Sequence, residues 1–302
     1  MKKLLIALLL LGMIMPLALC DTLPIYHKPD KNTSAPYEKV EELDEAPFAA
    51  DAETMRVDYV GIRQGDCIVI RVGGQTMLVD GGEGWRFPYV ESYLKANNID
   101  HFDVMFLTHA HDDHIEMQEK LIKAGYSVGK VISPYGEKDN YSLWNGYKKL
   151  LKSKGIPFET IKSGDVMEFG GATLNFYRWD DNKQTMNNHS VTALLQYGDA
   201  RVLLSADIGG EAQHWLLKNY DPELFKCDVY KAAHHGRTAA VAEFLTAMDP
   251  GLTIVTNTKS STATHDNQMN RRNVPRYYIS IGTINTETDG TQWYVWQEKE
   301  EQ

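Results

Sequence analysis

The folded part of the chain opens with short runs of apolar and β-branched residues. These runs occupy residues 55–60, 67–72 and 75–79, and Gly73 and Gly74 separate the last two. A glycine pair between two such runs is typical of a tight hairpin, because the favoured two-residue turns need positive φ at their central positions. The pattern predicts three strands close together, of which the last two pair antiparallel.

Helical and strand periods alternate along the rest of the chain. In segment 141–154, for example, Leu143, Tyr147, Leu150 and Leu151 fall on one helical face. The expected helices are 88–96, 114–124, 141–154, 210–219 and 239–248. The further expected strands are 103–107, 128–132, 166–169, 173–177, 191–196, 202–205, 228–232, 252–255, 277–281 and 293–296. Hairpins mixed with strand–helix alternation predict an α+β protein whose sheets carry helices on their outer faces.

The first twenty residues differ from the rest of the chain. Lys2 and Lys3 precede the apolar run 4–11, and small residues stand near the end of the segment. This pattern is typical of a secretory signal peptide, and the apolar run is short for a permanent membrane span. A buried N-terminal helix would instead leave two lysines at the head of an apolar segment. Residues 1–20 are therefore predicted to be a signal peptide, and the mature protein to be exported, extracellular or at the cell surface.

Cys20 leaves two processing routes open. Ala18 and Cys20 suit a cut before Asp21, which would release the protein. The same stretch resembles a lipobox, in which Cys20 would be lipidated, although Leu19 stands where such motifs prefer a small residue. The released form is the preferred interpretation. Membrane contact is expected only through the signal peptide or a lipid on Cys20.

Residues 21–53 are predicted to form a disordered tether. Four prolines (Pro24, Pro29, Pro36 and Pro47) punctuate an acidic stretch with little periodic apolar content. Such a segment buries too little surface to offset the entropy of ordering it. The remaining residues, 54–302, have the size of one large domain.

Charge and cysteine content narrow the class of protein. The formal net charge of −10 becomes −12 without Lys2 and Lys3 (−10 − 2), and no basic stripe is present. No extended nucleic-acid-binding surface is therefore evident, because an acidic surface repels a phosphate backbone. A small or polymeric phosphodiester is still compatible with a site whose metal ions supply positive charge. Cys67 and Cys227 lie in apolar runs, which favours two buried thiols over a disulfide.

A cluster of histidines and carboxylates follows the strand expected at 103–107. Three of the ten histidines, His109, His111 and His114, stand within six residues, together with Asp113. Alternate residues at a strand end project to the same side, so His109 and His111 can hold one ion. The turn into the next helix would direct Asp113 and His114 towards a second ion. Imidazole and carboxylate ligands together suit zinc, and manganese or iron less well.

This His-x-His-x-Asp-His run resembles the metal signature of the metallo-β-lactamase superfamily. Segments 80–82 (Asp-Gly-Gly), 203–207 (Leu-Leu-Ser-Ala-Asp) and 231–236 (Lys-Ala-Ala-His-His-Gly) resemble further motifs of that family in the expected order. The resemblance covers about residues 55–298. It implies a four-layer αββα sandwich with the site at one edge, between the two sheets.

Segments 60–66 (Val-Gly-Ile-Arg-Gln-Gly-Asp) and 187–190 (Asn-Asn-His-Ser) narrow the resemblance. They are similar to the extracellular hydrolase domain of ComEC-type DNA-uptake channels and to bacterial phosphorylcholine esterases of the same branch. The chain departs from that branch in the Ile62–Arg63 region, where the motif usually reads Val-Gly-Gln-Gly-Asp. It departs again at Arg237, where a serine usually follows His-His-Gly. Both departures bear on the substrate more than on the metal chemistry.

The resemblance implies a dinuclear site with two zinc ions per chain. His109, His111 and Asp207 would hold the first ion, and Asp113, His114, Asp207 and His234 the second. A carboxylate between two cations binds both, and a water molecule between them becomes hydroxide near neutral pH and serves as the nucleophile. The expected catalytic residues are Asp113, Asp207 and His265.

Other residues have weaker assignments. His265 resembles a late histidine at the site mouth that binds or protonates substrate, with a solvated loop histidine as the competing interpretation. His189 stands where many superfamily members have a ligand, but at a variable position of this branch. The candidates for orienting ligands or contacting substrate are Asp66, Asp80, Asn188, His189, Lys231 and His235.

The leading interpretation is an exported dinuclear-zinc hydrolase that cleaves a phosphodiester, such as DNA, a wall polymer or a head-group ester. A β-lactam or lactone hydrolase is the alternative, although Asp207 stands where the best-known β-lactamases of this fold carry a cysteine. A metal-binding surface protein without turnover is the alternative from another class.

Overall fold

The structure is a computed structural model that describes residues 25–26, 48, 52–181 and 184–298. The predicted signal peptide, 1–20, lies outside the described residues. Of the predicted tether, only 25–26, 48 and 52–53 are described. Within it, Ile25–Tyr26 form the two-residue strand β1, which pairs antiparallel with β16 (Trp293–Gln297), and Phe48 packs edge-on against Tyr294 with ring centroids 4.7 Å apart. Among the described residues, no helix is long and apolar enough to cross a membrane.

The strands of the described part form two mixed sheets. The first sheet has the order β1-β16-β15-β2-β3-β4-β5-β6-β7 and the second β14-β13-β12-β11-β10-β9-β8. The first sheet contains, besides β1 and β16, strands β2 (Met55–Tyr59), β3 (Cys67–Val72), β4 (Gln75–Asp80), β5 (His101–Phe106), β6 (Ser127–Ser133), β7 (Phe158–Thr160) and β15 (Ile284–Thr288). The second contains β8 (Val166–Phe169), β9 (Ala172–Tyr177), β10 (Thr192–Tyr197), β11 (Ala200–Leu204), β12 (Val229–Lys231), β13 (Leu252–Val255) and β14 (Arg276–Tyr278).

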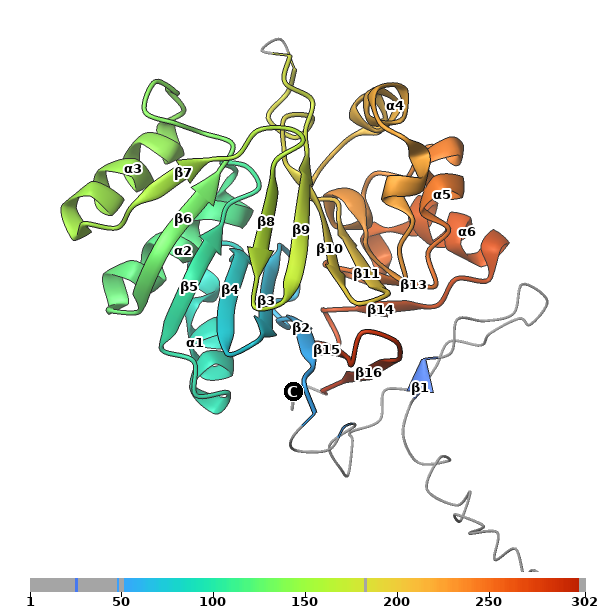
Figure 1. Ribbon diagram of the computed structural model, residues 1–302, viewed down its shortest axis with the longest axis horizontal. Coiled ribbons are helices and arrows are strands. Elements are labelled where there is room, and N and C mark those ends of the chain that lie inside the picture. Colours follow the sequence, from blue (N-terminus) through green and yellow to red (C-terminus); the bar gives the residue numbers. More distant parts are fainter. Residues whose placement is uncertain (1–24, 27–47, 49–51, 182–183, 299–302) are drawn as a thin grey trace, which may run out of the picture.

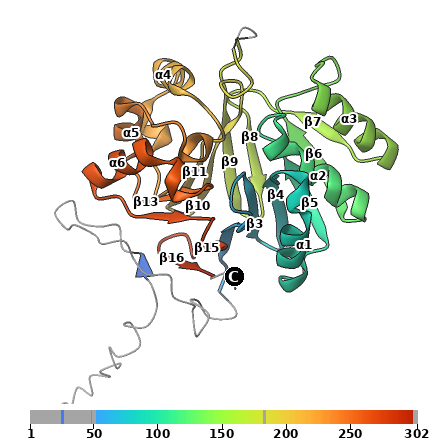
Figure 2. The same cartoon turned by 180° about the vertical axis from the view of Figure 1, so that it is seen from behind.

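Helices cover the outer face of each sheet (Figures 1 and 2). The first sheet carries α1 (Phe87–Ala96), α2 (Asp112–Ala124) and α3 (Ser142–Lys154), and the second carries α4 (Gly210–Asn219), α5 (Ala242–Met248) and α6 (Ala263–Arg272). The short 3-10 helices are η2 (Gly84–Arg86), η3 (Pro222–Phe225), η4 (Ala233–Gly236) and η5 (Lys259–Ser261). The predicted α+β class and αββα sandwich are confirmed.

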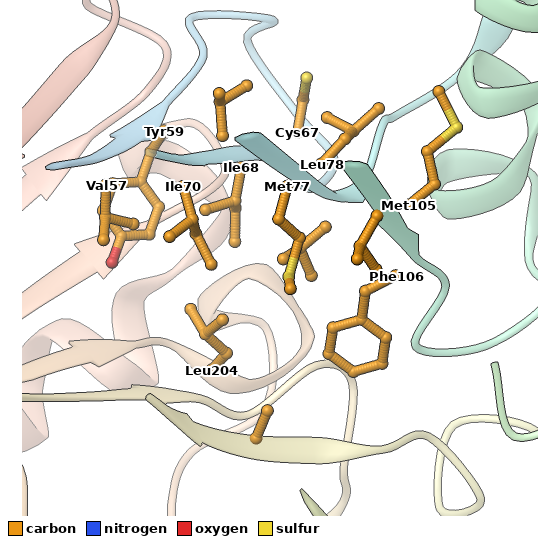
Figure 3. Packing of buried hydrophobic residues seen from close by; sticks show 14 of the residues in the cluster. Val57, Tyr59, Cys67, Ile68, Ile70, Met77, Leu78, Met105, Phe106 and Leu204 are labelled. Carbon is orange, nitrogen blue, oxygen red and sulfur yellow. The ribbon is translucent and has the colours of Figure 1, made fainter. Parts of the chain in front are cut away.

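The main core lies between the sheets. Val57 and Ile70 of the first sheet face Leu204 of the second (Figure 3), and all three are at most 1% exposed. Phe106 of β5 meets Phe176 of β9 edge to face, with ring centroids 5.3 Å apart. Such contacts bury apolar surface worth about 25 cal/mol per Å² and hold the two sheets at one spacing.

Two predicted hairpins touch each other across the sandwich. The β3–β4 turn at Gly73-Gly74 and the β8–β9 turn at Gly170-Gly171 have positive φ at all four residues. A Cβ on Gly73 would lie 2.3 Å from the carbonyl oxygen of Gly170. Glycine is therefore required both by the turn and by the close approach of the two sheets.

The structure adds elements that hydrophobic patterning did not predict, chiefly β7, β15 and α6. Strand β15 is mostly polar, yet it is buried between β16 and β2, where Thr286 Oγ1 donates to the Val57 carbonyl at 2.8 Å. Helix α6 buries only His265 and Met269, too few positions to produce a helical period. The two predicted buried thiols are confirmed, because Cys67 and Cys227 are both buried and no disulfide joins them.

Candidate metal centre

The carboxyl ends of parallel strands from both sheets meet at one edge of the sandwich. In the first sheet, β4 ends at Asp80, and β5 leads through Thr108 into the histidine run. In the second sheet, β11 leads into Asp207 and β12 into η4, which contains His234 and His235. Ligand sites in open α/β sheets form outside the carboxyl ends of parallel strands, which is where these side chains gather.

One carboxylate oxygen occupies the middle of the cluster. Asp207 Oδ2 lies 3.9 Å from Nε2 of His109, 3.5 Å from that of His114, 3.8 Å from that of His234 and 3.4 Å from that of His235. Asp207 is 2% exposed. A carboxylate shared by imidazoles from two sheets has the position that a ligand between two ions needs.

The histidine run contributes from the start of α2. His111 precedes the helix in an extended conformation, and the acidic Asp112 and Asp113 occupy its first turn, where the helix dipole favours negative charge. His109 Nε2 lies 3.0 Å from His111 Nδ1. Asp113 Oδ1 lies 3.7 Å from His114 Nε2, and its Oδ2 lies 3.2 Å from His235 Nε2.

Two further carboxylates hold the outer ring nitrogens of His114 and His235. Asp80 Oδ2 lies 2.7 Å from His114 Nδ1, and Asp66 Oδ1 lies 3.1 Å from His235 Nδ1. In each case the Nε2 atom points to Asp207. A carboxylate on one ring nitrogen fixes the tautomer in which the other nitrogen offers its lone pair to a metal.

Four ligand-forming residues come within 4.8 Å of one another: Asp66, His114, Asp207 and His235. Three of their buried atoms, His114 Nε2, His235 Nε2 and Asp207 Oδ1, have no hydrogen-bond partner among the described residues. Buried polar atoms are almost always satisfied, so three unsatisfied atoms in one cluster indicate a missing cation partner. The oxygen and imidazole donor set fits zinc, iron or manganese.

The charged groups of the cluster shift one another's pKa values. Burial opposes protonation of His114 and His235, but the neighbouring carboxylates together outweigh it: Asp207 first, then Asp80 for His114 and Asp66 for His235. They raise the pKa of His235 to about 10 and that of His114 well above its usual value. Burial would likewise raise the pKa of Asp207, yet His235 and His114 hold it well below its usual value. A divalent cation would replace these ring protons, which is the usual exchange when a metal binds.

Comparison with known proteins agrees with this geometry. The family model described as the metallo-beta-lactamase superfamily matches residues 60–256, which is more than half of the chain. The chain belongs to the metallo-β-lactamase superfamily. Membership makes it a metal-binding protein of a hydrolase family, with the Asp and His cluster as its candidate site.

Two curated relatives support a ComEC-like member of this superfamily. ComE operon protein 3 of Bacillus subtilis (strain 168) is 27% identical over 267 residues, which cover 80% of this chain and 33% of that protein. Recombination protein 2 of Haemophilus influenzae is 25% identical over 201 residues, covering 64% of this chain and 23% of that protein. The chain thus spans about a third or less of the length of these relatives.

A solved structure supports the fold. The metallo-beta-lactamase fold protein YhfI of Bacillus subtilis superimposes with a TM-score of 0.52 at 13% identity, over 82% of this chain and 100% of that protein. At this identity the likeness extends to the fold alone.

Both histidines of the His-His-Gly segment lie within 4 Å of Asp207 Oδ2. His234 was the predicted ligand and His235 a predicted orienting residue, but His235 is fully buried and lies closer to Asp207 Oδ2 than His234, whose side chain is 30% exposed. His234 Nδ1 lies 3.0 Å from Thr238 Oγ1. Both residues adopt positive φ, 50° and 56°, and so do Asp80 and Ala206 beside the cluster. Left-handed backbone at non-glycine residues costs energy and is concentrated at functional sites.

Residues 187–190 hold the segment of backbone that contains and follows Asp207. Asn188 Oδ1 accepts from Gly209 N at 3.0 Å, and its Nδ2 donates to Glu211 at 3.2 Å, so Asn188 holds the start of α4 directly after Asp207. His189 is buried, and its Nε2 contacts the Asp181 carbonyl rather than the cluster.

His265 is a buried residue of α6 near Tyr230 of the second sheet. It is 0% exposed on α6, and its ring lies 6.2 Å from that of Tyr230. Tyr230 packs with the helices on the outer face, whereas its neighbour Lys231 points to the cluster. The structure therefore does not place His265 at an open site mouth, nor in a solvated loop.

Sequence patterns missed several residues that hold the cluster. Thr108 donates to Asp80 from its backbone nitrogen at 2.8 Å and from its hydroxyl at 2.7 Å. Thr256 Oγ1 lies 3.0 Å from His235 Nδ1, and the Asp207 nitrogen donates to Ser190 Oγ at 3.2 Å. Thr108 and Thr256 each follow a strand by one or two residues, and this position was the available signal.

Acid is expected to destabilise the fold through His265. Burial, aided by Arg276, lowers the pKa of His265 to about 4, although Asp266 acts in the opposite direction. An unfolded histidine titrates near 6.5, so the contribution of neutral His265 is complete above about pH 6.5 and is lost as pH falls towards 4. Between pH 6.5 and 4.5, the free energy of unfolding of the parent should fall about 2 kcal/mol more than that of His265→Met. Urea unfolding at several pH values measures this, and parallel curves would contradict it.

Proposed function

We propose that this chain is an exported two-metal hydrolase that cleaves a phosphodiester. The observation that carries the proposal is the position of Asp207 Oδ2 within 3.9 Å of four imidazole nitrogens from both sheets. Export rests on the pattern of residues 1–20, and fractionation of cells that express the full chain tests it: intact protein that starts at Met1 in the cytosol would contradict export.

The residues of the chain divide into two ligand groups around Asp207. His109 and His111 would hold the first ion. Asp113, His114 and one or both histidines of the His-His-Gly segment would hold the second. A pair of bound divalent ions supplies Lewis acidity and lowers the pKa of water towards neutrality. Asp80 and Asp66 hold the rings of His114 and His235 in the orientation that this requires.

Three features favour a phosphodiester over a β-lactam. A carboxylate, Asp207, stands at the shared position in place of cysteine. Two curated relatives, ComE operon protein 3 and Recombination protein 2, are ComEC-type proteins. Arg237 is exposed directly after the His-His-Gly segment, and its positive charge contributes to lowering the pKa of His234, after burial and the neighbouring charges of His235 and Lys231. A cation beside the cluster attracts an anionic substrate.

The parent protein is expected to hydrolyse bis(p-nitrophenyl) phosphate faster than a chromogenic cephalosporin. Both rates should disappear when a chelator removes the metal. Phosphorylcholine esters and single-stranded DNA, assayed alongside, distinguish a head-group substrate from a nucleic acid. Comparison of kcat/KM across the four substrates is the measurement.

Two outcomes would overturn the proposal. A higher kcat/KM on the cephalosporin would favour the β-lactam alternative. Tight zinc binding with no turnover of any of these substrates would favour a metal-binding surface protein. The Asp207→Asn variant, purified in parallel, controls for a contaminating phosphodiesterase, because it should lose the activity while a contaminant would not.

A further inference from the structure

Lys231 is a fully buried lysine at the metal centre, and neither ligand group of the proposed function uses it. It ends β12 and is 0% exposed. Its Nζ forms an ion pair with Asp66 Oδ2 and donates to the Ala206 carbonyl at 3.0 Å. A buried ammonium without such partners would be strongly destabilising, so its burial indicates a defined structural task.

Asp66 connects this lysine to an imidazole of the cluster. One carboxylate oxygen contacts Lys231 Nζ, and the other lies 3.1 Å from His235 Nδ1. Asp66 directly precedes β3 of the first sheet, whereas Lys231 and His235 belong to the second sheet. The contact therefore joins the two sheets across the metal centre and spans 169 residues of sequence between Asp66 and His235.

The contact also determines which nitrogen of His235 faces the centre. A carboxylate that has a lysine as its counter-charge stays ionised and accepts the Nδ1 proton of His235. Nε2 of the same ring then points to Asp207 Oδ2 at 3.4 Å and to Asp113 Oδ2 at 3.2 Å. Asp80 performs the same task for His114, but its partners are the neutral donors of Thr108 and not a lysine.

Lys231 approaches Asp207 without forming a hydrogen bond to it. The distance from Nζ to Asp207 Oδ1 is 3.7 Å, and that oxygen has no hydrogen-bond partner among the described residues. The ammonium thus balances part of the negative charge of the cluster and leaves Asp207 Oδ1 available to a cation.

We propose that Lys231 and Asp66 act as one buried positioning pair, which joins the two sheets and accepts the Nδ1–H of His235 so that the ring keeps its Nε2 facing Asp207. The proposal rests on the metal site of the proposed function, but not on the phosphodiester substrate. Neither residue is a catalytic residue, because both act through His235 and Asp207.

The experiment compares Lys231→Met, Asp66→Asn and the double variant with the parent. Zinc dissociation constants are measured by competition with a chromophoric chelator, and the proton on His235 Nδ1 is followed in long-range ¹H–¹⁵N correlation spectra of the metal-free protein. Each single variant should weaken binding of the ion that His235 would hold about 10- to 100-fold, as is usual for residues that orient ligands. The double variant should lose no more than either single variant, because the pair acts as a unit.

Lys130→Met is the matched control. Lys130 forms an ion pair with Glu159 at 2.9 Å on the surface. Lys130→Met therefore also removes one lysine charge, but a charge that is far less buried than that of Lys231. This variant should leave the zinc affinity and the signal of the His235 Nδ1 proton unchanged. If Lys231→Met does not fold, the nearly isosteric Asp66→Asn decides the result by the same measurements.

Unchanged zinc affinity in both single variants, additive losses in the double variant, or an unchanged signal of the His235 Nδ1 proton would each overturn the proposed pair. This outcome is separable from the proposed function. A parent that binds two zinc ions but cleaves no phosphodiester contradicts the proposed function, and the zinc affinities of the variants still test the pair. A parent that binds no zinc also contradicts the proposed function, and the spectra of the His235 Nδ1 proton still test the pair.

Discussion

Alanine in place of Asp207 is expected to lower kcat by about a hundredfold or more and to reduce metal content. The side chain presents one oxygen to four imidazole nitrogens at 3.4 to 3.9 Å, so its removal takes a shared partner from both proposed ligand groups. The nucleophile of a dinuclear hydrolase depends on both ions, so the loss should appear mainly in kcat. Steady-state kinetics with bis(p-nitrophenyl) phosphate and elemental analysis measure the two effects.

Asp199→Ala and His189→Ala provide the comparison. Asp199 is exposed in the turn at the opposite end of β11, so its variant should behave as the parent does. His189 contacts the Asp181 carbonyl rather than the cluster, so its variant should keep near-parental metal content, and any effect on turnover should fall on KM rather than on kcat. Full metal and full rate in Asp207→Ala would refute the shared-ligand assignment.

Removal of metal by a chelator is expected to lower the Tm by roughly 5–10 °C for each site, if the free metal concentration before removal is about a hundredfold above the Kd of that site. A ligand bound only by the folded state stabilises that state, and three buried cluster atoms have no hydrogen-bond partner in the described part of the chain. Added zinc should restore the Tm, whereas magnesium should restore it poorly, because imidazole ligands suit zinc better.

The Asp207→Ala variant serves as the internal control for this measurement. Its Tm should respond to chelator and zinc much less than that of the parent. A parent Tm that is indifferent to both reagents would contradict a metal centre at this edge of the sandwich.

Local sequence was sufficient to predict most helices and strands and the ligands that the first sheet contributes to the metal centre. The glycine pairs at 73–74 and 170–171 predicted two hairpins because turn geometry depends on neighbouring residues alone. The histidine run predicted ligands from the first sheet for the same reason, since a strand end and the following helix start fix the directions of their side chains. The resemblance to a known family then pointed to Asp207 and the His-His-Gly segment.

Tertiary context determined the elements that patterning missed. The polar residues of β15 form a strand because β2 and β16 supply hydrogen-bond partners on both sides. Helix α6 buries only His265 and Met269 and has little apolar periodicity of its own. Propensity and periodicity are weak guides where neighbours distant in sequence provide the stabilisation.

The sequence by itself determined the α+β class, the ligands of the histidine run and the two buried thiols, because each depends on spacing or on apolar content within a short window. The αββα arrangement and the ligands Asp207 and His234 were implied by the resemblance to a known family. Only the tertiary structure decided which partners meet across the two sheets. Asp66 and His235 are 169 residues apart, yet their side chains lie 3.1 Å from each other, and Lys231 becomes a buried ion-pair partner only once the sheets are packed. The same packing buries His265 near Tyr230. A contact between two sheets depends on their relative placement, which comes from the whole core and is encoded in no local pattern.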